Sequence, residues 1–120
     1  MNIIIVLLIL FYLCLKHYIA DFLLQTKNMA IQKGIYGNIP GIWHTLTQIL
    51  LSMPLLILFW PNFFPLLLEA LTHYHMDWFK IWYNKRRQWH PQTKEFWWLL
   101  GLDQFVHYTI YLIMIGWWLL

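Results

Sequence analysis

Long apolar segments alternate along the chain with short polar connections. Four segments, at about residues 2–25, 41–60, 63–83 and 96–120, consist mainly of aliphatic and aromatic side chains. Each is close to the roughly 20 residues that a helix needs to cross the hydrocarbon core of a bilayer. The pattern therefore predicts an all-α protein, a four-helix transmembrane bundle of antiparallel up-down topology. We expect residues 1–120 to form a single integral membrane domain.

The composition supports a membrane environment. The chain is 61% hydrophobic, 20% aromatic and only 11% charged, against about 25% charged residues in ordinary domains. Its nine tryptophans suit the two bilayer interfaces, where an apolar ring and a polar N–H are both accommodated. We expect membrane lipids as surroundings and no nucleic-acid partner. A chain this small and aromatic could also form a homo-oligomer or be a subunit of a larger membrane assembly.

The basic residues predict the orientation. Lysines and arginines gather in the first and third connections, at 26–40 and 84–95, whereas the turn at 60–62 carries no charge. The positive-inside rule places the two basic connections in the cytoplasm and both termini outside. The first apolar segment has no basic residue before it and no small-residue cleavage pattern after it, so we expect a retained span and not a signal peptide. A short interfacial helix is expected at 28–33, and Pro54 is expected to kink the second span.

A sparse set of polar residues interrupts the apolar segments. His17 with Asp21, His73 with Asp77, and Asp103 with His107 are each four residues apart, and His44 opens the second segment. Residues at i and i+4 lie on one helix face, so each pair directs two polar groups the same way. In the antiparallel topology every pair lies roughly 5–18 Å inside the cytoplasmic end of its helix, at about 1.5 Å per residue. We therefore expect one polar layer near the cytoplasmic face.

This layer has the chemistry of a divalent metal site. A buried Asp costs about 2.5–3.5 kcal/mol at the centre of a membrane helix, so such groups usually serve a function. Imidazole and carboxylate groups bind zinc, manganese or iron. The predicted ligands are His17, Asp21, His44, His73, Asp77, Asp103 and His107. They exceed one tetrahedral shell, so either two ions bind or some acids orient the histidine rings.

Other polar residues of the spans are expected around that site. Gln25, Gln48 and Gln104 continue the same faces and would support the ligands, and Glu69 is the deepest acid. Glu69 could form an ion pair with Lys16 or belong to a proton path. Lys16 and Lys80 are typical of side chains that snorkel to the headgroups. His75 and His90 are expected at the interface, outside the layer.

Three classes of function fit these features. A metal could activate water to hydrolyse an amphiphilic substrate, although no catalytic residue is assigned. The same groups could form an ion or proton transport site, although the outer halves of the spans are nearly all apolar. Alternatively the polar layer could only fix helix packing, at roughly 0.6 kcal/mol per hydrogen bond. Whether the protein is an enzyme stays open.

Four short motifs are similar to those of a known family. They are H-x3-D-F-x-L-Q from His17 to Gln25, a histidine (His44) opening the second span, H-x3-D-x2-K from His73 to Lys80, and D-Q-x2-H from Asp103 to His107. In these motifs the chain resembles small multi-pass bacterial and phage membrane proteins catalogued as domain of unknown function 3307. The resemblance covers nearly the whole chain and implies a bacterial or phage-encoded protein of the inner membrane. It groups these residues, Lys80 included, without implying an activity.

Overall fold

The computed structural model describes residues 2–119, and within this range the protein is all helical, with no strand. The prediction of an all-α protein is confirmed. The elements in chain order are α1 (Ile3–Tyr18), the π-helix η1 (Ile19–Leu23), α2 (Lys27–Gln32), α3 (Ile39–Ser52), the 3-10 helix η2 (Met53–Leu55), α4 (Leu56–Phe59), α5 (Phe64–Arg87) and α6 (Lys94–Leu119).

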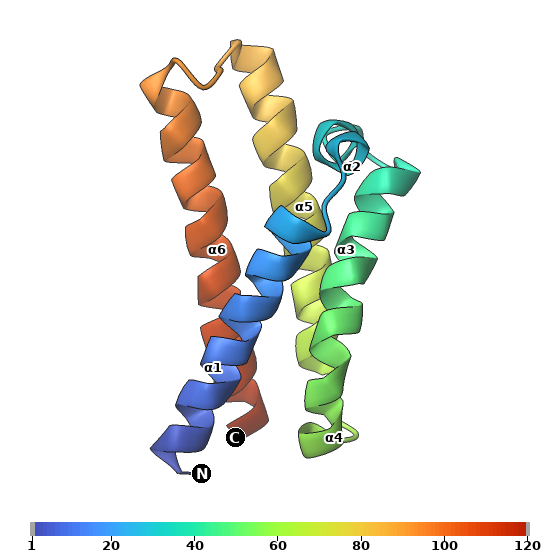
Figure 1. Cartoon of the computed structure of the whole chain (residues 1–120), viewed down its shortest axis with the longest axis vertical. Coiled ribbons are helices and arrows are strands. Elements are labelled where there is room, and N and C mark those ends of the chain that lie inside the picture. The colour runs from blue at the N-terminus through green and yellow to red at the C-terminus, as the bar shows by residue number, and fades with distance from the viewer. Residues whose placement is uncertain (1, 120) are drawn as a thin grey trace.

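The long helices lie along one axis of the molecule (Figure 1), whose extents are 46 × 28 × 23 Å. Helix α5 packs against α6 and α3, and α1 packs against α6 and α3. The connection between α5 and α6 lies at one end of the molecule, and both chain termini lie toward the other (Figure 1). Short α2 lies beside the upper part of α5 in this view and packs on α3.

Three helical segments are long and apolar enough to cross a membrane: Ile3–Leu23, Ile39–Phe59 and Lys94–Leu119. Helix α5, expected as another span, is not among them because its charged residues lower its hydropathy. Its polar residues nevertheless point inward, since Glu69, His73, Asp77 and Lys80 are all buried. Its outer surface carries exposed Phe64, Leu67 and Leu71, among others. This arrangement, polar inside and apolar outside, is the reverse of that in a soluble helical protein.

An apolar cluster fills the half of the molecule that contains both termini. Its buried members are Ile9, Leu13, Leu55, Leu66, Tyr111, Met114, Ile115 and Trp118. These residues come from α1, η2, α5 and α6 and pack together between these elements. The buried polar residues occupy the other half.

Local sequence explains the breaks in the helices. Pro54 lies in the 3-10 helix η2, which separates α3 from α4, and proline cannot donate the backbone hydrogen bond of a regular helix. The kink expected at this residue stays a prediction. The short helix expected at 28–33 is α2, and the hydroxyl of Thr26 accepts a hydrogen bond from the Met29 N–H at its start. The π-helix η1 was not predicted from the sequence. It contains Asp21, and such turns often occur at functional sites.

Candidate metal centre

The residues predicted to form a polar layer come from four helical segments and lie close together. His17 and Asp21 come from α1 and η1, His44 from α3, His73 and Asp77 from α5, and Asp103 and His107 from α6. Every one of these side chains is buried. The spacing of four residues places each pair on one helix face, and packing of the helices turns those faces toward one another.

Four of the predicted ligands converge on one point. They are Asp21, His44, His73 and Asp77, called here the four-residue site. The Nε2 atom of His44 lies 3.0 Å from Asp21 Oδ1 and 3.2 Å from Asp77 Oδ2. The Nε2 atom of His73 lies 3.6 Å and 3.2 Å from the same two oxygens. The two Nε2 atoms are 3.2 Å apart, so imidazole nitrogens and carboxylate oxygens from three segments of the chain face a common centre.

These separations can be compared with those around a metal ion. Four ligands at bonds of about 2.0–2.1 Å in a tetrahedron lie about 3.3–3.4 Å from one another. The five nitrogen–oxygen and nitrogen–nitrogen separations of the four-residue site span 3.0–3.6 Å. The Nδ1 atoms of His44 and His73 are buried and have no hydrogen-bond partner among residues 2–119. The set is therefore able to hold one small divalent ion through Nε2, although no protein group fixes the opposite side of either ring.

A second group of possible ligands adjoins the first and shares Asp77 with it. It consists of Asp77, Asp103 and His107, called here the Asp103 group. His107 Nε2 lies 3.0 Å from Asp103 Oδ1 and 3.8 Å from Asp77 Oδ1. The ammonium group of Lys80 occupies this group, where it donates a hydrogen bond to Asp103 Oδ2 and lies 3.4 Å from Asp77 Oδ1. A positive charge of the protein itself thus neutralises the second set of carboxylates.

His17 belongs to neither group. Its Nε2 lies 2.9 Å from Gln104 Oε1 and 3.3 Å from Asp21 Oδ2. Its Nδ1 lies 2.9 Å from the hydroxyl of Tyr111. The structure therefore gives the His17 ring polar partners on both sides, next to the four-residue site.

The three glutamines lie differently around the layer. Gln48 donates a 2.7 Å hydrogen bond to Asp21 Oδ1, so it supports a member of the four-residue site directly. Gln104 donates to Asp103 Oδ2 at 3.0 Å. Gln25 instead donates to the backbone oxygen of Asp21 at 3.1 Å and reaches no imidazole or carboxylate of the layer.

The prediction that Lys16 and Lys80 snorkel to the headgroups is wrong. Lys16 is only 1% exposed, forms a buried ion pair with Glu69 and donates to Gln48 Oε1 at 2.8 Å. Glu69 in turn accepts a 2.7 Å hydrogen bond from the hydroxyl of Ser52. Both lysines turn inward because buried carboxylates on neighbouring helices offer them a closer partner than the interface does. The ion pair considered for Glu69 is present.

Lys33 is the main functional candidate that the sequence reasoning missed. It follows α2, is buried, and donates a 3.0 Å hydrogen bond to Asp77 Oδ2. Gly34 and Gly41 are the sequence features from which the burial of Lys33 could have been predicted. A Cβ at Gly34 would lie 2.3 Å from Ile81 Cγ2, and one at Gly41 would lie 3.0 Å from Lys33 Cα. The turn can approach α5 and α3 so closely only because both residues lack a side chain.

The two remaining histidines lie outside the layer, as expected. His75 is exposed and contacts the Tyr36 hydroxyl at 2.9 Å, whereas His90 contacts Gln92 in the connection before α6. His75 is only two residues from His73, but the helical period directs it to the opposite side of α5. It thus offers an internal comparison for any role of His73.

The buried charges of the layer do not cancel. Four buried carboxylates, those of Asp21, Glu69, Asp77 and Asp103, face three buried ammonium groups, those of Lys16, Lys33 and Lys80. With neutral imidazoles this leaves one negative charge. Glu69, Asp77 and Asp103 each contact a lysine, whereas within residues 2–119 Asp21 pairs only with histidines. With neutral imidazoles, Asp21 in the four-residue site is therefore the carboxylate that lacks a cationic partner within residues 2–119.

Comparison with known proteins identifies a family. A family model described as Protein of unknown function (DUF3307) matches residues 9–120. The chain therefore belongs to this family. No curated protein and no solved structure matches the chain.

Proposed function

We propose that this member of the DUF3307 family is a four-helix, antiparallel membrane protein that binds one divalent metal ion near the cytoplasmic face. The exposed apolar surfaces of the helices and the three segments able to span a bilayer support the membrane placement. The exposed cations at the end of α5 support a cytoplasmic position for that end. Lys33, one of the basic residues in the connection at 26–40, is buried and therefore does not support this orientation.

One observation carries the proposal: five of the six mutual separations in the four-residue site, 3.0–3.6 Å, are close to those of tetrahedral metal ligands. The two imidazole nitrogens and two carboxylate oxygens come from three segments of the chain, and all four residues are buried. Two imidazoles and two carboxylates in four-fold coordination favour zinc. Manganese and iron are the alternatives, and a bound ion of either kind would need further ligands from the layer.

We propose one ion and not two. Lys80 contacts one oxygen of each carboxylate of the Asp103 group, Asp77 Oδ1 and Asp103 Oδ2, and so places a positive charge where a second ion would lie. In the four-residue site Lys33 donates to Asp77 Oδ2, so an ion there shares this oxygen with Lys33 or displaces it, whereas Asp21 contacts no lysine within residues 2–119. The cationic side chain of Lys80 thus substitutes for a second metal.

The metal proposal is tested by elemental analysis of the detergent-purified protein. We expect about one equivalent of zinc per chain, retained after gel filtration. His73→Gln removes one ligand and should abolish stoichiometric binding, while His75→Gln, at an exposed position two residues away, should leave it unchanged. If the folded wild-type protein retains no ion, or if both variants behave alike, the layer serves helix packing only.

Hydrolysis of an amphiphilic substrate is a second candidate. The neighbouring pair of Asp103 and His107, a carboxylate 3.0 Å from an imidazole, supports it, because such a pair can accept a proton from water. The burial of all four ligands counts against it, since catalytic zinc sites keep one open position. A fluorogenic phospholipid in detergent micelles provides the assay: hydrolysis that requires metal and is lost in His107→Gln would establish this role. Metal-bound protein without such hydrolysis would exclude phospholipid hydrolysis and leave the ion as a link between helices.

Transport receives less support from the arrangement. Beyond the Lys16–Glu69 ion pair, the apolar cluster around Leu13, Leu66 and Met114 fills the other half of the molecule. An ion would have to pass through packed aliphatic side chains with no polar partner. A homo-oligomer or a larger membrane assembly is compatible with the apolar outer surface, and gel filtration with light scattering would determine the assembly state.

A further inference from the structure

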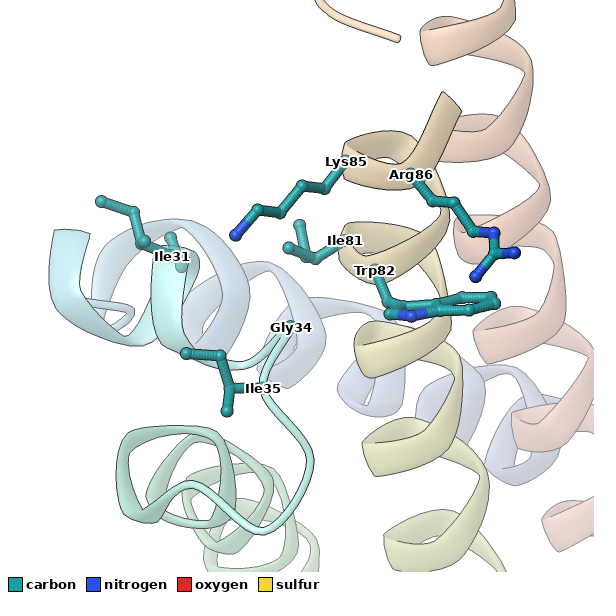
Figure 2. A pocket seen from close by; sticks show the side chains of 8 residues that line it. Ile31, Gly34, Ile35, Ile81, Trp82, Lys85 and Arg86 are labelled. Carbon is teal, nitrogen blue, oxygen red and sulfur yellow. The ribbon is translucent and has the colours of Figure 1, made fainter. Parts of the chain in front are cut away.

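A groove separates α2 and its following turn from the last turns of α5 (Figure 2). Its volume is about 700 Å³, within the range of small-molecule sites. Ile31 and Ile35 lie on one side and Ile81 on the other (Figure 2). At Gly34 the turn lies directly against Ile81, since a Cβ there would be 2.3 Å from its Cγ2. The two sides of the groove therefore meet at an apolar contact between Gly34 and Ile81.

One cation reaches into this apolar space. Lys85 extends from α5 toward the side of Ile31, whereas Arg86 extends to the other side of α5, where its guanidinium lies 5.6 Å from the centre of the Trp82 ring (Figure 2). The Lys85 side chain is exposed and forms no salt bridge within residues 2–119. The groove therefore combines an apolar wall with one unpaired positive charge.

We propose that the groove binds one acidic phospholipid, with the phosphate at Lys85 and an acyl chain along Ile31, Ile35 and Ile81. The charge complementarity is that of a cationic side chain near a membrane surface, which attracts anionic lipids. Trp82 fits the same level, because its ring is suited to the bilayer interface. The proposal does not depend on the metal ion, since no member of the groove belongs to the four-residue site.

The test is lipid binding to the full chain in detergent, measured by native mass spectrometry with a chelator present. Short-chain phosphatidylglycerol is the probe, and phosphatidylcholine of the same chain length is the comparison. We expect one phosphatidylglycerol per chain and weaker binding of phosphatidylcholine. Lys85→Gln should weaken phosphatidylglycerol binding about fivefold, from about 1 kcal/mol for one cation near an anionic surface.

A matched change distinguishes the groove from general attraction to the basic end. Arg86→Gln removes the same charge from the next residue, but this side chain extends to the other side of α5, against Trp82. We expect less than about a twofold effect from it. Ile35→Asp should weaken binding without removing a cation. Equal losses for Lys85→Gln and Arg86→Gln, equal binding of the two lipids, or complete displacement by millimolar inorganic phosphate would each overturn the proposal.

Discussion

Replacing Asp21 by Asn removes a charge from the four-residue site and keeps the shape of the side chain. Asp21 Oδ1 lies 3.0 Å from His44 Nε2 and accepts a 2.7 Å hydrogen bond from Gln48. The amide oxygen of Asn can still accept that hydrogen bond. Asp21→Asn therefore isolates the role of the negative charge, and we expect the fold to be retained.

The size of the effect follows from the number of ligands. Binding by four-ligand structural zinc sites is worth about 10–16 kcal/mol, so one ligand corresponds to roughly 2.5–4 kcal/mol. At about 1.4 kcal/mol per tenfold change, the dissociation constant should rise by about 60- to 700-fold. With zinc at about 100 times the wild-type dissociation constant, the wild type gains about 2.7 kcal/mol of stability and the variant almost none.

Thermal unfolding in detergent, with zinc and with a chelator, measures both quantities. Zinc should raise the unfolding temperature of the wild type and of Glu95→Gln, a carboxylate-to-amide change outside the layer, but not that of Asp21→Asn. With chelator, Asp21→Asn should be at least as stable as the wild type, because Asp21 has no lysine partner. An Asp21→Asn protein that still binds one equivalent of zinc with wild-type affinity would refute the ligand assignment.

The other predictions concern the lysines and the exposed histidine. Lys80→Met removes the positive charge from the Asp103 group, and elemental analysis should then find two ions per chain in place of one. An unchanged ratio of ions to folded protein would contradict the proposal that Lys80 takes the place of a second metal ion. Lys16→Met leaves Glu69 buried without its cation and should lower the free energy of unfolding by about 3–5 kcal/mol. The double variant Lys16→Met with Glu69→Leu should regain most of this free energy in chemical unfolding. No recovery in the double variant would show that the unpaired Glu69 is not the cause of the loss. His75→Ala should leave zinc affinity within about threefold of the wild type, because this ring is exposed and contacts Tyr36; a larger loss would place His75 in the site.

The hydrophobic pattern and the helical period were sufficient for much of the fold. Apolar segments of membrane length predicted an all-α protein, and the spacing of four residues predicted that His73 and Asp77 share a face. Both follow from local geometry, because the period of a helix is independent of its neighbours. Glu69, His73 and Asp77 follow one another at intervals of four residues, and all three are buried on α5.

Local geometry was insufficient for the lysines. Lys16, Lys33 and Lys80 are long, flexible side chains that can reach either the interface or an interior carboxylate. Whether such a side chain lies at the interface or in the interior depends on the distance to a partner on another helix, as in the contact of Lys33 with Asp77. That distance is set by how closely the turn at Gly34 approaches α5.

The sequence by itself determined which residues are polar within apolar helices and which of them share a face, since both depend only on residue type and helical period. Only the tertiary structure decided which atoms meet. Asp21 lies with His44 and His73, while His17 turns to Gln104 and Tyr111. The rotation and axial position of each helix relative to the others determine these partners. They arise from packing along the whole length of the helices and from the π-turn at η1, neither of which a spacing of four residues specifies.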